Sequence, residues 1–565
     1  MEKYMNKKWE CYNLDNEKVE ELVKKRHITN LLASILVNRG IIDGEKINVF
    51  LNPTRKDFYN PFLMPDMEIA VKRIVKAIEN KEKIMIYGDY DADGITSITV
   101  LKKYLNEIGL KTGEYIPNRL NEGYGLNKDA ISKIYNDGYK LMITVDCGIS
   151  GLEEVDYANS LGMEIIITDH HEPAEKLPEA IAVIDAKRKD NKYPFNQLAG
   201  VGVVFKLIQA ISTELKLEEK EYLKYLDLVC IGTISDIVPL VDENRVIAKL
   251  GLKLIEKTKN IGLKTLLNIA DLKKIDSNAI SFGVAPRINA CGRMGFQEEA
   301  LQLFLTEDSG EATKIAKRLV QFNQERQAKE KQIFEEVIEK IEKDDKDKKC
   351  IVLAEENWHH GVIGIVASKI TEIYYKPSIL ICLEGDKGKG SGRSVPGFDL
   401  YTALTKCSDY IEKFGGHSMA IGITIKKENF EKLKEAIEKY AQESNISDIM
   451  PIINIDKEIN LKNINIEEVK SLELLEPFGE GNKMPLFLLR NLKIDSIRAL
   501  SGGKHLKLTL KQDNNIVDAI GFNMGDLSKE YLLGDKVDVV GTIEINSFGN
   551  KENIQINLKD IRKAM

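Results

Sequence analysis

Residues 87–94 read YGDYDADG and follow the apolar run at 84–86. An apolar run that ends in a glycine-marked turn is typical of a buried strand leading into a loop. Asp89, Asp91 and Asp93 alternate along this loop, where three carboxylates repel one another unless a positive charge lies between them. Hard oxygen ligands favour Mg²⁺, Mn²⁺ or Ca²⁺, so the stretch predicts a divalent metal site. A calcium-type loop or an acidic turn without chemistry is the alternative.

The chain around this stretch alternates between helical and strand-like patterns. Apolar periodicity predicts helices at 70–78, 97–108, 126–136 and 151–161, and strands at 84–87, 114–117, 141–145 and 164–168. This alternation predicts a parallel sheet with helices on both faces, in which sites form beyond the carboxyl ends of the strands.

Two further predicted strands end at metal-ligating residue types, Asp146 in one case and Asp169-His170-His171 in the other. A lone histidine is more often a hydrogen-bonded polar residue than a ligand. Here two of only seven histidines are adjacent and follow an aspartate at a strand end, which favours metal binding. Asp236, after the apolar stretch 226–234, is another candidate, with a capping or turn aspartate as the alternative.

These residues are enough to ligate two divalent ions, Mn²⁺ or Mg²⁺. The candidate ligands are Asp89, Asp91, Asp93, Asp146, His170, His171 and Asp236, and all except Asp89 are also the candidate catalytic residues. Paired ions activate water and neutralise charge on a phosphate during in-line displacement. We expect Asp146, on a central strand, to bridge the ions, and the predicted reaction is hydrolysis of a phosphoester or phosphoanhydride.

Composition sets limits on the class of protein. The 565 residues are 43% hydrophobic and 30% charged, which predicts several globular domains. No apolar run approaches the roughly 18 residues that span a bilayer, and residues 1–10 lack the apolar region of a signal peptide, so we expect a cytoplasmic protein without membrane contact. The seven cysteines form no C-x-x-C pair, which argues against a disulfide framework or a thiolate zinc site.

The formal net charge of −7 is mild evidence against nucleic-acid binding, because phosphate recognition normally requires a basic face. Net charge sums over the whole surface, however, and a local basic cleft is compatible with it.

Four motifs in this order resemble the DHH phosphoesterase superfamily: GDYDADGITS (88–97), TVDCG (144–148), TDHHEP (168–173) and GTISDIVPL (232–240). The superfamily includes RecJ-type exonucleases, family II pyrophosphatases, nano-RNases and cyclic dinucleotide phosphodiesterases. Several members have a histidine four residues before the aspartate that aligns with Asp91. This chain has Tyr87 there, and RecJ-like members commonly lack that histidine. The resemblance leaves Asp89 as a replacement ligand or as a residue that orients the others.

Two further segments are RecJ-like. PNRLNEGYGL (117–126) places Arg119 near the sheet edge, where a phosphate clamp is favoured over a surface salt bridge. APRINACGR (285–293) adds Arg287, Asn289 and Arg293, which we expect in a glycine-containing turn and among the substrate-binding residues.

A long polar helix is predicted at 310–344, with a thin apolar stripe, and a second α/β domain follows it. WHHGVIGIVASKI (358–370), GKGSGRS (388–394) and FGGHSMAIG (414–422) resemble the DHH-associated domain. Glycines that admit a phosphate close to the backbone, beside polar donors, predict a substrate clamp. Its candidate residues are His360, Ser391, Arg393, Ser394 and His417, and the resemblance implies that Ser391 and Arg393 hold the terminal 5′ phosphate or the neighbouring sugar. A hairpin for GKGSG and a core role for Trp358 are the alternatives.

The C-terminal pattern changes to short strands, predicted at 487–497, 505–510, 517–522, 536–545 and 553–561. Five such strands suit a Greek-key barrel of the OB type, a common binder of single-stranded nucleic acid. A purely structural β-domain is the alternative, with Phe487, Phe522 and Phe548 in its core.

The predicted fold class is therefore α/β, with two α/β domains joined by a long helix and followed by an OB-type barrel. The expected boundaries are 1–66 for a small helical N-terminal region, 67–265 for a DHH domain, 266–349 for the APRINACGR segment and the long helix, 350–450 for a DHH-associated domain and 451–565 for the barrel.

The resemblance implies a metal-dependent 5′→3′ exonuclease that hydrolyses single-stranded DNA to mononucleotides in recombination and repair. From the family only, it implies a single-strand-binding protein and a RecQ-type helicase as partners. We expect a monomer. The alternatives are a nano-RNase or cyclic dinucleotide phosphodiesterase of the same superfamily, and a nucleic-acid-binding module with an inactive site.

Overall fold

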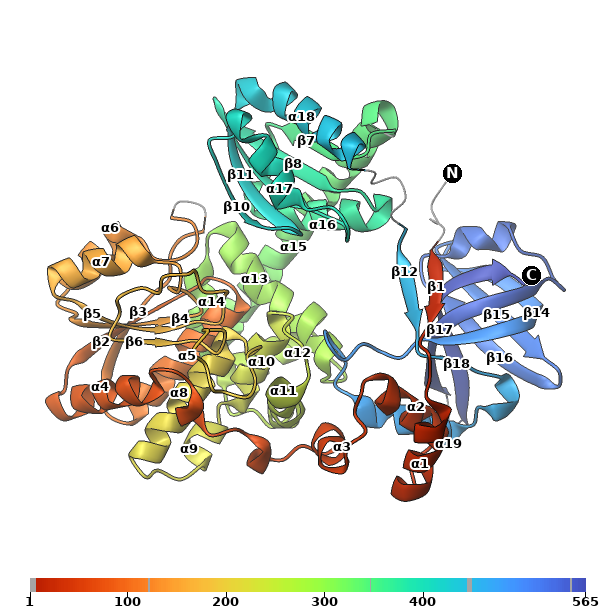
Figure 1. Ribbon diagram of the computed structural model, residues 1–565, viewed down its shortest axis with the longest axis horizontal. Helices are drawn as coiled ribbons and strands as arrows, with labels where there is room; N and C mark the ends of the chain where they lie inside the picture. The colour runs from red at the N-terminus through yellow and green to blue at the C-terminus, as the bar shows by residue number, and fades with distance from the viewer. Residues whose placement is uncertain (1–6, 120–121, 346, 445–449, 549–550, 565) are drawn as a thin grey trace.

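The protein is described by a computed structural model that covers residues 7–119, 122–345, 347–444, 450–548 and 551–564. Three lobes are visible in Figure 1: a first α/β lobe, a second α/β lobe above it, and a β-barrel on the right. The predicted fold class is confirmed. Among the described residues, no helix combines the length and apolar composition that a bilayer crossing requires.

The first lobe contains a parallel five-stranded sheet. In spatial order its strands are β3 (Lys111–Tyr115), β2 (Lys83–Gly88), β4 (Leu141–Val145), β5 (Glu164–Thr168) and β6 (Ala182–Ile184). One face packs against α4 (Met67–Asn80), α5 (Ala92–Glu107) and α8 (Gly200–Glu214), and the other against α6 (Lys128–Asn136) and α7 (Leu152–Leu161). Both faces are covered because parallel strands connected by helices leave no solvated face.

Helix α5 begins five residues earlier than the periodicity predicts, because the aspartate loop itself caps it. The carboxylate of Asp91 accepts hydrogen bonds from the backbone N–H groups of Asp93 and Gly94, at 2.9 and 3.0 Å. An N-cap aspartate satisfies two of the unpaired donors of the first turn. The acidic loop and the start of the helix are therefore one structural unit.

A helical layer follows the sheet. It comprises α9 (Lys220–Leu223), α10 (Leu226–Ser235), α11 (Asp242–Ile255), α12 (Ile261–Ile269), the π-helix η3 (Ala279–Val284), α13 (Ala285–Met294) and α14 (Gln297–Leu305). APRINACGR lies in α13, so the predicted glycine-containing turn is wrong. Pro286 occupies the first turn, where the missing N–H costs nothing. A Cβ on Gly292 would lie 2.7 Å from the carbonyl oxygen of Tyr90, so the glycine serves close packing against the acidic loop.

The long connecting helix is α15 (Ser309–Lys340), whose 32 residues extend about 48 Å at 1.5 Å per residue. Its apolar stripe is buried as predicted, but in two different cores. Ile315, Leu319 and Phe322 pack in the first lobe, whereas Ile333 and Val337 pack in the second. The helix continues into the π-helical turn η4 (Ile341–Asp345).

The second lobe has a mixed sheet in the order β10 (Lys413–His417), β11 (Ala420–Lys426), β9 (Lys387–Arg393), β8 (Ser378–Glu384) and β7 (Ile351–Glu355). Helix α16 (His360–Tyr374) and the end of α15 cover one face, and α17 (Leu400–Lys406) and α18 (Phe430–Glu443) cover the other. His417 ends the edge strand β10.

The glycines of GKGSGRS have a different role from the predicted one. They form the central strand β9, and a Cβ on Gly388, Gly390 or Gly392 would lie 2.7 to 2.8 Å from isoleucine side chains of β8 and β11. The glycines therefore make room for the core, and the expectation that they admit a phosphate is wrong. Because side chains alternate along a strand, Ser391 and Arg393 project from the opposite face, toward α16.

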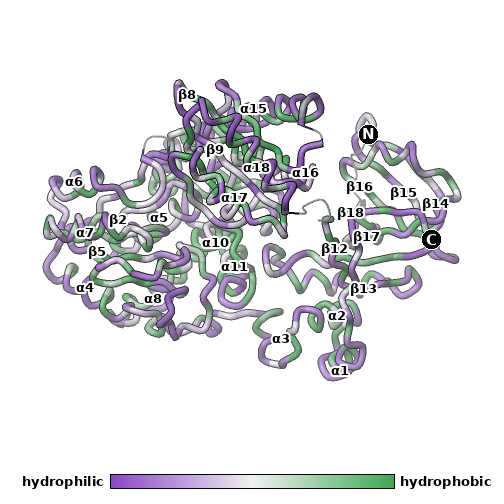
Figure 2. The backbone as a smooth tube through the Cα atoms, turned by 45° about the horizontal axis from the view of Figure 1, so that its top comes forward, coloured by the Kyte–Doolittle hydropathy of each residue, from purple (hydrophilic) through white to green (hydrophobic). Residues whose placement is uncertain are grey.

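The C-terminal lobe is a closed barrel. Its strands are β14 (Phe487–Leu500), β15 (His505–Gln512), β16 (Asn515–Gly521), β18 (Lys551–Lys563) and β17 (Lys536–Phe548), and β17 pairs back with β14. Figure 2 shows hydrophobic and hydrophilic residues alternating along these strands, as expected when one face lines the interior. Phe487 is fully buried, whereas Phe522 is 56% exposed beside His505. The side chain of Phe548 lies outside the described residues.

The N-terminal helices α1 (Asn16–Arg26), α2 (Asn30–Asn38) and α3 (Gly44–Leu51) were predicted as a helical region, but strand β1 (Lys8–Cys11) was not. It pairs in parallel with β12 (Ile452–Ile455). The helices share one hydrophobic core with the barrel and with α19 (Ile466–Ser471), while β13 (Lys457–Glu458) extends the barrel sheet. The two ends of the chain thus pack as one body. The proposed domain boundaries stay predictions.

A buried arginine joins this body to the first lobe. Arg245, on α11, is 1% exposed. Its guanidinium donates to the carbonyl oxygens of Phe50, Leu474, Glu476 and Pro477, at 2.6 to 3.4 Å. It also lies 3.8 Å from the centroid of the Phe50 ring. One side chain thus connects α11, α3 and the segment before the barrel.

We expect Arg245→Leu to lower the free energy of unfolding by about 3 kcal/mol, because the hydrogen bonds of a buried guanidinium to four carbonyl groups are lost. Urea denaturation followed by circular dichroism measures the loss. Arg55→Leu, at a surface ion pair with Glu219, should change stability by less than about 0.5 kcal/mol. Equal effects of the two substitutions would contradict a clamping role for Arg245.

Candidate metal centre

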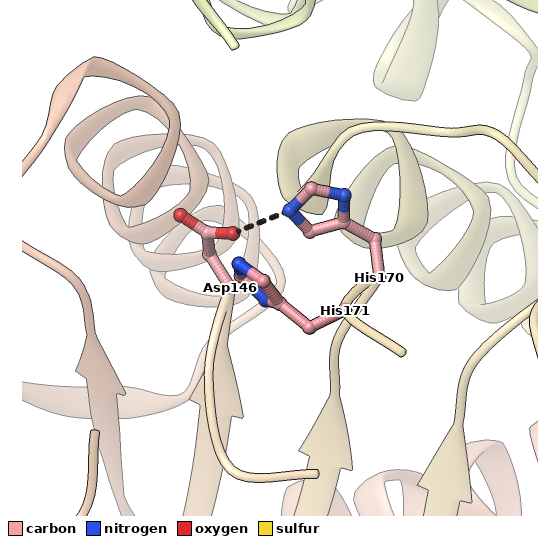
Figure 3. Close-up of side chains that lie close together, drawn as sticks. All are labelled: Asp146, His170 and His171. Carbon is pink, nitrogen blue, oxygen red and sulfur yellow. Dashed lines mark ion pairs between the residues drawn. The ribbon is translucent and has the colours of Figure 1, made fainter. Parts of the chain in front are cut away.

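The carboxyl ends of three neighbouring strands bring the candidate ligands together. Asp89, Asp91 and Asp93 follow β2, Asp146 follows β4, and His170 and His171 follow β5, while Asp236 caps the end of α10. Ligand atoms lie within 4.8 Å of one another in three groups: Asp146, His170 and His171; Asp93, His170 and Asp236; and Asp89, Asp91 and Asp146. All seven predicted ligands are therefore found in one cluster. Figure 3 shows the first group at the strand ends.

His170 lies at the middle of this cluster. Its Nε2 is 3.1 Å from Asp146 Oδ1, 3.7 Å from Asp236 Oδ2 and 4.0 Å from Asp93 Oδ2. His170 Nε2, Asp146 Oδ1 and Asp89 Oδ1 are buried without a hydrogen-bond partner among the described residues. Buried polar atoms are nearly always hydrogen-bonded, so three buried ligand atoms without a hydrogen bond in one cluster fit a bound divalent cation.

The charges in the cluster are unfavourable without a cation. Burial, and then repulsion from Asp93, raises the pKa of Asp236 to about 9. Burial and the neighbouring Asp91 raise the pKa of Asp93 to about 7, and the pKa of Asp146 is raised by the same kinds of cause. Burial lowers the pKa of His170 to about 3, so its imidazole is neutral, which is the form that binds a metal. A divalent ion would offset the repulsion between the carboxylates.

The backbone around the cluster lets the carboxylates of Asp93 and Asp146 lie close to the start of α8. Asp93 accepts hydrogen bonds from the N–H groups of Gly200 and Val201 at the start of α8, at 2.6 and 2.9 Å. A Cβ on Gly200 would lie 2.6 Å from Asp146 Oδ1, so only glycine fits there. Asp146 itself has φ of +59°, a left-handed conformation that costs free energy in a non-glycine residue and is concentrated at functional sites.

The first residue of the Asp169-His170-His171 triplet supports the cluster from behind. Asp169 is fully buried and accepts hydrogen bonds from the N–H groups of Ile149 and His170, and its Oδ1 lies 2.7 Å from His171 Nδ1. Burial alone would lower the pKa of His171, but the hydrogen bond to Asp169 raises it to about 9. Asp169 thus orients His171, which leaves Nε2 of that ring to act as a ligand.

Sequence reasoning missed two residues of the site. Tyr124 is in contact with His171, its hydroxyl 3.2 Å from Nδ1, and it also donates to the carbonyl oxygen of Asp146 at 3.3 Å. Its position in PNRLNEGYGL, five residues after Arg119, was the available signal. Lys187 is the second, because its charge opposes the burial that raises the pKa of Asp236.

Three arginines converge beside the acidic cluster. Burial and then the charge of Arg119 lower the pKa of Arg293 to about 10, and the same causes lower that of Arg393. Arg119 lies 5.1 Å from the centroid of the Tyr90 ring within the acidic loop. Cations placed this close to one another are stabilised by an anion, and arginine suits phosphate geometry.

Several contacts fix these arginines between the two α/β lobes. Arg293 donates to the carbonyl oxygen of Gly361 in α16 at 3.1 Å, and Arg393 donates to Ser391 Oγ at 3.1 Å. Asn289 Oδ1 accepts from the backbone N–H of Ala92 at 2.7 Å and braces the acidic loop. His360 Nδ1 is buried without a hydrogen-bond partner among the described residues.

The remaining predicted substrate-binding residues make other contacts. Arg287 donates to the carbonyl oxygen of Gly283 in η3. Ser394 is buried and donates its hydroxyl to Phe398 at 2.7 Å. His417 is exposed and accepts from the N–H of Met419 at 3.3 Å. Their predicted roles in substrate binding stay predictions.

Three family models match the chain. They describe the DHH family N-terminal domain over residues 83–233, the DHHA1 domain over 347–443 and the RecJ OB domain over 455–560.

The chain is also similar to curated proteins along most of its length. It is 40% identical over 559 residues to the single-stranded-DNA-specific exonuclease RecJ of Bacillus subtilis, covering 98% of this chain and 70% of that protein. The RecJ of Thermus thermophilus is 33% identical over 503 residues, covering 87% and 70% of the two chains.

Solved structures show the same relationship. A crystal structure of Thermus thermophilus RecJ in complex with Mn²⁺ matches with a TM-score of 0.87 and 29% identity, over 99% of this chain and 80% of that one. A crystal structure of the same protein in complex with Mg²⁺ matches with a TM-score of 0.81 and 28% identity, over 99% and 79% of the two chains.

We expect Gly200→Ala to weaken Mn²⁺ binding about tenfold or more, because the added methyl group displaces the Asp146 carboxylate. Isothermal titration calorimetry of the metal-free protein measures the affinity. Gly422→Ala is the matched control, since a Cβ there meets no atom within 4 Å. Unchanged affinity in Gly200→Ala would show that Asp146 is not a ligand.

The metal-free protein should lose thermal stability as the pH rises from 7 to 9. The native pKa of Asp236 is raised to about 9, so the folded state holds a proton that the unfolded state has lost, and stability falls until the pH passes 9. The raised pKa of His171 acts in the same direction, because its stabilisation is complete below 6.5 and lost through about 9. Differential scanning fluorimetry in EDTA measures this slope.

Asp236→Asn should flatten that slope, because the amide does not titrate, and saturating Mn²⁺ should flatten it in the unmodified protein. A slope that is identical in the unmodified protein and in Asp236→Asn would contradict the assignment of the raised pKa.

Proposed function

Because the chain belongs to the RecJ family of DHH phosphoesterases, we propose that it is a metal-dependent exonuclease that hydrolyses phosphodiester bonds of single-stranded DNA. One observation carries the proposal: unpaired ligand atoms of Asp146 and His170 converge beside three clustered arginines. A cation centre next to a phosphate-binding surface is the arrangement that phosphodiester hydrolysis requires.

The residues that would hold two Mn²⁺ or Mg²⁺ ions are Asp89, Asp91, Asp93, Asp146, His170, His171 and Asp236. When bound, such ions supply hydroxide near neutral pH and neutralise charge on the phosphate. The protein's own groups prepare the site. Asp169 holds the ring of His171 in one orientation, and Gly200 and Val201 fix the carboxylate of Asp93.

The arginines orient the substrate. In the proposed complex, Arg119 and Arg293 bind the scissile phosphate, and Arg393 with Ser391 binds the terminal 5′ phosphate, as bidentate arginine chemistry favours. Arg293 is anchored to the second lobe through Gly361, which supports a fixed spacing between the two phosphate sites. A fixed distance from a terminal phosphate to the reacting one is the basis of the proposed 5′→3′ polarity and release of mononucleotides.

The barrel supports long single strands as substrates. It matches the RecJ OB domain over 455–560, and folds of this type bind strands through backbone contacts and stacking with weak sequence preference. Phe522, half exposed beside His505, is available for stacking. These features favour the exonuclease over the nano-RNase or cyclic dinucleotide phosphodiesterase alternative, which lacks the barrel.

The biological setting belongs to the same proposal. We place the enzyme in the cytoplasm, in DNA recombination and repair, acting as a monomer. A single-strand-binding protein and a RecQ-type helicase are its proposed partners, on the ground of family membership alone.

The test compares the purified protein with Asp146→Ala on single-stranded DNA labelled at either end, in Mn²⁺. We expect the unmodified protein to release labelled mononucleotide at once from 5′-labelled strands and late from 3′-labelled strands. Asp146→Ala should lower kcat by a factor of about 10³ or more, since the metal centre loses a central ligand. Equal rates for the two proteins would contradict the proposal of an enzyme, and early release of the 3′ label would contradict the proposed 5′→3′ polarity.

A further inference from the structure

An exposed apolar side chain lies directly beside the candidate metal centre. Ile237 follows Asp236 and is 71% exposed, whereas Ile234 and Leu240 on either side are buried in the core of the first lobe. In the loop 235–240, all of which the structure describes, Ile237 is the only exposed residue. A single exposed isoleucine is common and needs no explanation by itself.

The backbone conformation of Ile237 does need an explanation. Ile237 has φ of +61°, in the left-handed region. It follows the C-cap of α10, where glycine or asparagine is the usual residue, and a β-branched side chain is a genuine outlier there. The chain uses glycine to end α7 and α13 in the same conformation, at Gly162 and Gly295. Strained residues of this kind concentrate at ligand-binding sites.

The loop also connects the metal centre to the barrel. The N–H of Leu240 donates to the carbonyl oxygen of Glu480 at 2.7 Å. A Cβ on Gly481 would lie 2.8 Å from Pro239 Cβ, and a Cβ on Gly479 would lie 2.6 Å from Leu240 Cδ1. Along the chain, Ile237 therefore lies between Asp236 and the two residues, Pro239 and Leu240, that contact the segment leading into β14.

We propose that Ile237 is a substrate-contacting residue whose side chain packs against the nucleobase of a nucleotide approaching the metal centre. This inference rests on the proposed function and adds to it a residue of the strand path. An aliphatic side chain has no hydrogen-bonding group, so it contacts the faces of all four bases alike and agrees with weak sequence preference. The left-handed backbone is retained because it turns the side chain away from the core and toward the strand.

Ile237→Asn separates this role from a structural one, because asparagine tolerates the left-handed conformation and lacks the apolar surface. We expect the KM for a 5′-phosphorylated oligothymidylate to rise about tenfold, as the loss of one large apolar contact predicts, with kcat nearly unchanged. The thermal midpoint of the full chain should stay equal or rise. Ile237→Val, which keeps the apolar β-branched side chain, should behave nearly as the unmodified protein.

Two controls complete the experiment. Ile69→Asn removes an isoleucine of 50% exposure on α4, within the same lobe, and should leave the KM unchanged. On a strand whose 5′-proximal nucleotides are abasic, the unmodified protein and Ile237→Asn should have equal KM values, because neither has a base to contact at this position.

The outcomes decide between the ideas. Equal KM values on oligothymidylate would overturn the inference, and so would an Ile237→Asn defect that is as large on the abasic strand as on oligothymidylate. A lower thermal midpoint together with a lower kcat on both strands would assign Ile237 a structural role and overturn it as well. Failure of the unmodified protein to degrade either strand would instead overturn the proposed function, on which this inference depends.

Discussion

The repulsion among buried carboxylates at the ends of β2, β4 and β5 is the constraint on which the rest of the molecule depends. Asp93 and Asp146 are almost fully buried, and the charge of Asp93 raises the pKa of both Asp146 and Asp236. Burial of several like charges is too costly to persist unless a cation or a proton offsets it. The parallel sheet concentrates these side chains because neighbouring strands of one direction end at the same edge. The free energy of folding is therefore linked to metal binding.

The surrounding backbone can be understood as a response to this crowding. The carboxylate of Asp91 caps α5, and the carboxylate of Asp93 accepts hydrogen bonds from the N–H groups at the start of α8. These hydrogen bonds position the carboxylates before any ligand binds. Backbone strain is found nearby, at Asp146. Asp146 has a left-handed backbone conformation, and Gly200, which has no Cβ, lies directly against the Asp146 carboxylate.

Much of this centre could be predicted from the sequence because its information is local. Strand ends, an acidic loop and adjacent histidines lie within short stretches, and all seven candidate ligands lie in one cluster. What could not be predicted depends on packing between distant segments. GKGSGRS contains glycines suited to a phosphate loop, and only the isoleucines of β8 and β11 show why β9 needs them. The helix α13 and the shared core of the barrel and α1 to α3 depend likewise on partners remote in the chain.

The division of the site between two lobes explains why the long-range packing matters for chemistry. The candidate metal ligands lie on the first lobe, whereas Ser391 and Arg393 lie on β9 of the second, so the spacing between them is set by the elements that join the lobes. Helix α15 packs in both cores, and a continuous helix fixes the relative position of two lobes more firmly than a flexible linker does. Arg293 adds a direct contact from α13 to α16 at the site itself. The distance from the acidic cluster to Ser391 and Arg393 is thus a property of the fold, maintained by α15 between the two cores and by Arg293 at the site itself.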